Sequence, residues 1–232
     1  MSEEIGDIAL HEVVAVMVHD LNNPIAALGT NLRFLESTLG PSQSPDVVET
    51  LSDAHMLCEM LRHLVGNLGM LARPNLSPGR QFSIDVASSA KDAVARLCKQ
   101  AESSEVKLVL HDAVGPGDVF VEADRDLCAR ALDNLLAFAI ERAVRRTEIV
   151  VSVMKTDPIG VHVQFAARPE SAQASAHPSR SRQLQSAFGR GLSLHCARIA
   201  AAALGGRVDV RHEDGNTVTL ELALRTDDKQ IA

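Results

Sequence analysis

A seven-residue apolar repeat runs through the first segment of the chain, at Val14, Leu21, Leu28 and Leu35. A second apolar series follows, with alternating spacings of four and three residues, at Val47, Leu51, Ala54, Cys58, Leu61, Val65 and Leu68. Both spacings return to one face of an α-helix. The intervening sequence GPSQSP, residues 40–45, breaks the pattern, and Ser44 followed by Pro45 is typical of a helix N-terminus. The pattern predicts an antiparallel hairpin of two long helices.

The apolar stripes on these two helices are wider than one hairpin can bury. Further apolar residues flank both series, namely Leu10, Met17, Ile25, Leu32, Leu57, Leu64 and Leu71. Two hairpins that pair through these stripes would form a four-helix bundle. The sequence therefore predicts a homodimer.

The hydrophobic period changes after residues 73–79, whose sequence RPNLSPG has the composition of a linker. Apolar runs predict strands at residues 82–86, 106–110, 149–154, 161–165, 207–211 and 217–224. Helical spacing predicts helices at residues 90–102, 126–145 and 192–204. Residues 168–188, rich in Ser, Ala, Arg and Gln, are predicted to form a mobile loop. The predicted fold class is α+β, with the helices of this second part on one face of a mixed sheet.

The distribution of charge divides the chain at the same place. Residues 1–72 hold ten acidic residues and only Arg33 and Arg62 as bases, in a chain of net charge −7. An acidic first segment does not suit the phosphate backbone of a nucleic acid, so no nucleic-acid partner is expected. We predict a hairpin domain over residues 1–72, a linker over 73–79, a second domain over 80–226 and a tail over 227–232.

Composition indicates the compartment and the kind of site. The apolar content of 46% is typical of a globular protein. No apolar run reaches the roughly 18–20 residues of a membrane span, and the N-terminus is acidic rather than basic. The four cysteines are scattered without a CxxC spacing, which indicates neither disulfides nor a zinc site. We expect a cytoplasmic protein with no membrane partner and no bound metal.

One polar group interrupts the first apolar repeat. His19 lies two residues from the seam positions on either side, which turns it about 200° away, onto the outer face of the helix. Asp20 is its neighbour, Asn23 lies one turn further along, and Pro24 is expected to bend the helix. A carboxylate can hold one imidazole nitrogen protonated so that the other attacks, and an amide one turn away can position water or phosphate oxygens.

Two other interpretations of His19 stay open from these residues. An isolated His-Asp pair is most often an ordinary surface pair, without chemistry of its own. Metal binding is less well supported, because no second histidine or cysteine follows three or four residues later.

The segment HDLNNPIAALGTNLRFLE, residues 19–36, in the first helix of a hairpin, resembles the H-box of bacterial two-component histidine kinases. The resemblance implies that His19 carries a phosphoryl group, that Asp20 assists its transfer and that Asn23 supports dephosphorylation of a response regulator. Pro24 matches the kink of that family.

The second part of the chain resembles the ATP-binding domain of the same family, a Bergerat-like α/β sandwich. EADRDLCARALDNLLAFAIERA, from residue 122, is similar to the N-box helix and aligns Asn134 with its first asparagine. The sequence GRGLSLHCARIAAAALGGRVDV, from residue 189, is similar to the last glycine box, with Gly189 and Gly191 as the phosphate-approach glycines.

The departures from the family fall on nucleotide chemistry. Phe138 stands where the N-box has the asparagine that holds Mg²⁺, and it offers no oxygen ligand. The family's Asp-x-Gly-x-Gly is replaced by AARPES at residues 166–171. The resemblance therefore implies a degenerate nucleotide pocket, vestigial roles for Asn134, Gly189 and Gly191, and no ATP or Mg²⁺ cofactor.

Three functions remain possible for such a chain. The first is a histidine phosphotransferase, similar to those of the ChpT type, which exchanges phosphoryl groups between His19 and receiver domains without ATP. Its partners would be response-regulator receiver domains, with an upstream hybrid histidine kinase as a further candidate. The second is an active soluble histidine kinase or phosphatase with a divergent ATP site. The third is a pseudokinase scaffold that binds a receiver or a kinase without His19 chemistry.

Overall fold

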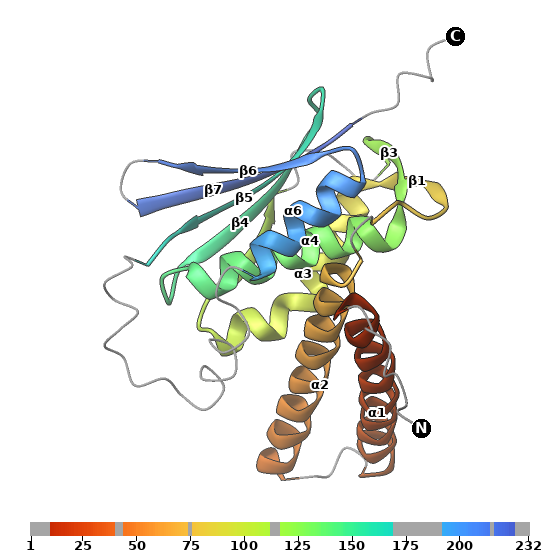
Figure 1. Ribbon diagram of the computed structural model, residues 1–232. Coiled ribbons are helices and arrows are strands. Elements are labelled where there is room, and N and C mark those ends of the chain that lie inside the picture. The colour runs from red at the N-terminus through yellow and green to blue at the C-terminus, as the bar shows by residue number, and fades with distance from the viewer. Residues whose placement is uncertain are drawn as a thin grey trace, which may run out of the picture. The chain divides into compact units, whose positions relative to one another are not determined.

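The computed structural model describes residues 10–39, 44–73, 76–111, 117–168, 192–213 and 216–225. The chain forms two compact units, Met1–Asn75 and Leu76–Ala232. Figure 1 shows the helices and strands of both units. No helix within the described ranges is long and apolar enough to cross a membrane.

The first unit is the predicted helical hairpin. It consists of α1 (Leu10–Leu39) and α2 (Pro45–Leu71). Ser44 occupies the N-cap position of α2 with extended backbone angles, as expected. Its carbonyl accepts a hydrogen bond from the backbone N–H of Val47 at 3.0 Å, whereas its side chain makes no capping bond. The fixed backbone of Pro45 in the first turn therefore helps to define where α2 begins.

A small apolar core holds the two helices together. Ile25 and Leu32 of α1 are buried against Cys58 and Val65 of α2, and Val18, Leu51 and Ala54 pack against this cluster. The predicted heptad residues do not form this core: Leu21, Leu28 and Leu35 remain 40–45% exposed. The apolar stripe of α1 is too wide for one neighbouring helix to cover. α2 therefore buries the edge of the stripe that contains Ile25 and leaves the edge that contains Leu28 exposed.

The second unit is built on a five-stranded sheet with strand order β2-β4-β5-β7-β6. Its strands are β2 (Lys107–His111), β4 (Glu148–Met154), β5 (Ile159–Ala166), β6 (Arg207–His212) and β7 (Thr217–Leu224). β2 and β4 are parallel and every other neighbouring pair is antiparallel, so the sheet is mixed, as predicted.

Among the described residues, three helices cover one face of this sheet: α3 (Val86–Ser103), α4 (Arg125–Arg142) and α6 (Leu192–Ala203) (Figure 1). The strands send alternate residues into the layer between sheet and helices, including Val151, Val163 and Leu220. This period of two explains why the sequence located these strands to within two residues. The predicted arrangement of helices on one face of a mixed sheet is confirmed.

A second, two-stranded sheet pairs β1 (Gln81–Asp85) with β3 (Phe120–Asp124). Each of its strands ends in an aspartate that caps the following helix. The Asp85 carboxylate accepts from the backbone N–H groups of Ala87 and Ser88, and Asp124 accepts from those of Asp126 and Leu127. Partial burial raises the pKa of Asp85, but hydrogen bonds from Ser88 and neighbouring backbone groups outweigh it, so the pKa lies below its usual value.

The structure differs from the predicted elements at three places. α3 begins at Val86, inside the strand predicted at residues 82–86 and four residues before the predicted helix start, because Asp85 caps it. β3 was not predicted at all, since only Val121 and Ala123 in this short strand face the core. α4 ends at Arg142, three residues before the predicted end. The predicted loop at residues 168–188 lies outside the described residues except for Arg168.

The second unit should depend on a glycine at position 206, at the turn into β6. A methyl group on Gly206 would overlap the backbone oxygen of Ala223, which the pairing of β6 with β7 holds in place. We expect Gly206→Ala to lower the free energy of unfolding by about 1–3 kcal/mol in urea denaturation. Ala202→Ser on the exposed side of α6 is the control and should change it by less than about 0.5 kcal/mol. Equal stability of the two variants would contradict this explanation.

Candidate functional site

His19 projects into solvent from the first third of α1. Its side chain is 77% exposed and that of Asp20 is 71% exposed. The imidazole Nδ1 lies 3.2 Å from a carboxylate oxygen of Asp20. A proton on Nδ1 would be donated to this carboxylate, which leaves the lone pair of Nε2 available on the solvent side. The arrangement suits a nucleophilic imidazole better than a buried structural histidine.

Asn23 and Pro24 complete the polar interruption. Asn23 is exposed one turn beyond His19, so its amide lies on the same side of α1. Pro24 lies inside the helix and has no N–H to offer the carbonyl of Asp20, yet α1 continues from Leu10 to Leu39.

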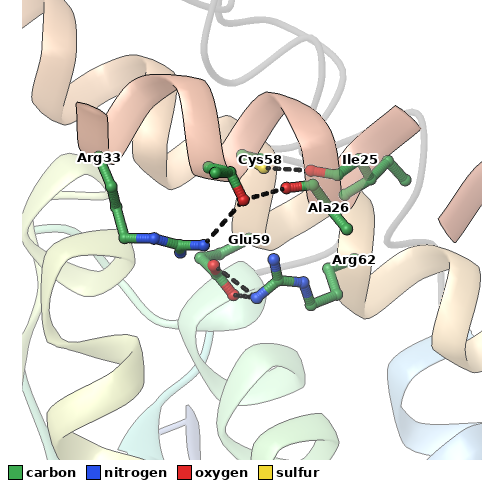
Figure 2. A network of polar contacts seen from close by, with 7 residues as sticks. Ile25, Ala26, Arg33, Cys58, Glu59 and Arg62 are labelled. Atoms are coloured by element: carbon green, nitrogen blue, oxygen red, sulfur yellow. Dashed lines mark hydrogen bonds and ion pairs between the residues drawn. The ribbon is translucent and has the colours of Figure 1, made fainter. Parts of the chain in front are cut away.

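The part of α1 on both sides of His19 is held from its buried side at two points. Ile25 is 7% exposed, and the thiol of Cys58 on α2 donates to its carbonyl at a distance of 3.5 Å (Figure 2). Val18, the residue before His19, packs over Gly69 of α2, where an added Cβ would meet it at 3.4 Å. These two contacts fix the direction in which His19 points. Ile25 therefore belongs to the core, whereas Ala26 beside it is exposed.

His55 on α2 has a different environment. Its ring lies 3.3 Å from the carboxylate of Glu36 on α1, and only 23% of its side chain is exposed. This contact joins the two helices, so His55 fits a structural role. His19, in contrast, has its carboxylate partner on its own helix and an open face.

The side chains in the described part of the chain that could bind a metal do not gather into larger groups. No group of three or more His, Cys, Asp or Glu side chains there is placed to hold a metal ion. Burial raises the pKa of Cys128 and of Cys196 to about 11, so these two thiols are poor nucleophiles near neutral pH.

Of the residues expected to form a vestigial nucleotide pocket, the structure describes Asn134, which is hydrogen-bonded within the protein. Asn134 is fully buried on α4, and its side-chain amide donates to the carbonyl of Arg130 at 2.9 Å. Phe138 is partly buried, and the guanidinium carbon of Arg142 lies 5.5 Å from the centre of its ring. Gly189 and Gly191 lie outside the described residues.

Arg168, at the end of β5, binds the C-terminal end of α4. Its Nε donates to the carbonyl of Ala143 at 2.6 Å, and its backbone N–H donates to that of Arg142 at 2.9 Å. Partial burial, followed by the nearby charge of Arg145, lowers its pKa from the ordinary value. A cation at a helix C-terminus is favourable, so Arg168 ties the strand end to the helix.

Glu141 on α4 is a titratable group that the sequence analysis did not single out. Burial raises its pKa from 4.5 to about 8, although the charge of Arg142 acts in the opposite direction. Between these two values the folded chain binds one more proton than the unfolded chain. The free energy of unfolding should therefore fall as the pH rises from about 4.5 to about 8.

Glu141→Gln should remove this pH dependence. We expect the variant to be more stable than the wild type at pH 8 and to lose less stability between pH 5 and pH 8, measured by urea denaturation. Glu122→Gln on exposed β3 is the control and should follow the wild type. A Glu141→Gln variant with the wild-type pH profile would contradict the burial argument.

Comparison with known proteins agrees with this architecture. No protein-family model matches the chain, and no curated protein matches it in sequence. Its structure is similar to a histidine kinase from Burkholderia phymatum STM815, with a TM-score of 0.53 and 17% identity over 94% of this chain and 92% of the other. Acinetobacter baumannii histidine kinase AdeS is similar with a TM-score of 0.51 and 13% identity, over 90% of this chain and 98% of AdeS.

A third similar structure is full-length ShkA in complex with AMPPNP. Its TM-score is 0.55 at 16% identity, and the match covers 94% of this chain but 47% of the ShkA chain. This chain thus spans about half the length of ShkA. At these identities the similarity shows the fold alone: a helical hairpin followed by an α/β domain with a mixed sheet, as in histidine kinases.

Proposed function

We propose that this protein is a histidine phosphotransferase of a two-component phosphorelay, similar to those of the ChpT type. It exchanges a phosphoryl group between His19 and aspartates of receiver domains, without ATP. The observation that carries the proposal is the exposed imidazole of His19, paired at 3.2 Å with Asp20, on the first helix of a hairpin in a histidine-kinase-like fold.

The transfer step uses the free ring nitrogen of His19. Its Nε2 lone pair attacks the phosphorus of a receiver's aspartyl phosphate, an N–P bond forms, and the O–P bond to the aspartate breaks in line with the attack. The leaving group is the receiver's carboxylate. The Nδ1 proton stays on the ring, and the carboxylate of Asp20 stabilises the positive charge that the ring acquires. Reversal of the same step passes the phosphoryl group to a second receiver.

Asn23 has a separate role in this proposal. Its amide lies on the side of His19, where it can hold a water molecule beside a phosphoryl group. Hydrolysis of the receiver's phosphate would depend on that water, whereas transfer to His19 would not. Asn23 therefore supports a secondary phosphatase activity.

The state of α4 supports a function without ATP. Phe138 supplies no oxygen for Mg²⁺, which is bound by oxygen ligands. Arg168 is hydrogen-bonded to the end of α4, in the stretch where a kinase would need its adenine-reading aspartate. The alternatives are an active histidine kinase or phosphatase with a divergent ATP site, which would require nucleotide binding, and a pseudokinase scaffold, which would not require His19.

The proposed active form is a homodimer. Met17, Leu21, Leu28 and Leu35 of α1 are 40–55% exposed and share one side of the helix. A second hairpin that covers this side would complete a four-helix bundle and leave His19 on the outside. Receiver domains are the proposed partners, with an upstream hybrid histidine kinase as the source of the phosphoryl group.

Phosphoryl transfer should depend on His19 and respond in a graded way to its neighbours. We expect His19→Ala to abolish exchange with a panel of phosphorylated receiver domains. Asp20→Asn should slow transfer by about 10²-fold, a usual scale for positioned acid–base help. Asn23→Ala should leave transfer largely intact and prolong the lifetime of the phosphorylated receiver. Radiolabel transfer measured by gel would report all three rates.

His195→Ala serves as the matched control, because His195 is an exposed helical histidine in the second unit. It should transfer at the wild-type rate. Exchange that survives in His19→Ala would reject the phosphotransferase and favour the scaffold.

Nucleotide binding should be weak. We expect calorimetry to detect no binding of ATP-Mg²⁺ tighter than millimolar, which corresponds to roughly −4 kcal/mol. Micromolar affinity, or label from the γ-phosphate of ATP on His19, would favour the kinase instead.

A further inference from the structure

The only two bases of the acidic hairpin converge on one point of its surface. Arg33 lies on α1 and Arg62 on α2, and Figure 2 shows both side chains. Both guanidinium groups end near Gly29 of α1. A Cβ built on Gly29 would lie 3.4 Å from Nη2 of Arg62 and 3.8 Å from Nη1 of Arg33. Like charges that meet in this way favour an anion between or beside them.

The two arginines differ in how they are neutralised. Nη1 of Arg62 binds both carboxylate oxygens of Glu59, at 2.9 and 3.2 Å. Arg33 makes one long hydrogen bond, from Nη2 to the hydroxyl oxygen of Thr30 at 3.4 Å. That hydroxyl in turn donates to the carbonyl of Ala26. Among the described residues no carboxylate lies within ion-pair distance of Arg33, so its exposed guanidinium retains donors for an external acceptor.

Arg33 lies on the same side of α1 as His19. The two residues are fourteen positions apart, which places them about 40° from each other around the helix and about 21 Å apart along it. A compact domain of about 100 residues has a radius of gyration of about 13 Å, so one such domain can reach both. Leu28, on the apolar side, is about 140° away from Arg33. A second copy that covers the apolar side therefore leaves Arg33 accessible.

We propose that Arg33 is a specificity-determining residue, which selects the receiver domain that reaches His19 by pairing with a carboxylate on that receiver's docking surface. The inference rests on the proposed function. Glu59 binds Nη1 of Arg62, and Nη2 of Arg62 faces Gly29. Because one carboxylate faces two guanidinium groups here, the charge of this surface stays positive. Phe34, next in the chain and 65% exposed, adds an apolar contact at the edge of the same surface. Arginine and aromatic side chains often dominate the binding energy of protein interfaces.

The test uses the full chain and the receiver domain that shows the fastest His19-dependent transfer in the panel. Transfer rates are measured against receiver concentration for the wild type, Arg33→Glu and Arg33→Lys. We expect Arg33→Glu to raise KM by about ten-fold or more and to change kcat by less than about two-fold. Arg33→Lys keeps the charge but loses the planar donor fork, so its KM should lie between the two.

Two controls separate docking from general charge effects. Arg146→Glu makes the same charge change at a residue 88% exposed in the second unit, and it should leave KM unchanged. KM of the wild type should rise with salt more steeply than that of Arg33→Glu. A scan of Asp/Glu→Lys changes on the receiver should contain one that restores the low KM of Arg33→Glu.

The outcomes distinguish this inference from the proposed function. If the wild type transfers to no receiver, the proposed function fails, and this inference with it. If transfer depends on His19 but Arg33→Glu leaves KM unchanged, only the inference is overturned. It is also overturned if Arg146→Glu raises KM equally, or if sedimentation shows that Arg33→Glu changes the oligomeric state.

Discussion

The rotation of α1 about its own axis decides what this protein can do with His19, and a small apolar contact fixes that rotation. Ile25 and Leu32 are buried against Cys58 and Val65, and Val18 sits over Gly69. A turn of α1 by a single residue, about 100°, would move these side chains out of the contact and carry His19 toward a different side. Burial of each large apolar side chain contributes roughly 1.5–3 kcal/mol. The observed orientation of α1 about its axis is therefore strongly favoured over the turned one. The exposed imidazole is thus a consequence of packing on the opposite side of the helix.

In the second unit, polar side chains stabilise the ends of the helices. α3 and α4 each begin at a strand-terminal aspartate, Asp85 and Asp124, whose carboxylate satisfies N–H groups of the first turn. These caps set where the helices start, and the sheet then buries their apolar sides. At the other end of α4, Arg168 binds carbonyls that the helix leaves unpaired. Asn134 on α4 and Arg168 after β5 lie in the two segments that the sequence linked to nucleotide, and both side chains are hydrogen-bonded to backbone carbonyls of the protein itself.

Sequence patterns predicted the parts of the fold that depend on periodicity. The hairpin and the five strands of the mixed sheet each repeat an apolar spacing over several residues. The sequence did not predict β3, because only two of its residues face the core. The start of α3 was predicted too late, because the capping of α3 by Asp85 outweighs the strand-like pattern before it. His19, Asp20 and Asn23 were visible because their polarity interrupts an apolar repeat. The convergence of Arg33 and Arg62 over Gly29 was not visible, because it depends on how two helices align.

Three sides of α1 have different environments. The side with Ile25 and Leu32 packs against α2, and the neighbouring side with Leu21 and Leu28 is apolar and open. The remaining side carries His19 and Arg33, which lie about 180° and about 140° from Leu28 around the helix. The two apolar sides adjoin each other, so a bundle that buries both would leave the polar side as one continuous strip along the helix. A partner that docks on that strip can reach the imidazole without disturbing the apolar contacts that orient it. Chemistry and partner choice can then vary through exposed residues, while the position of His19 stays fixed by the core.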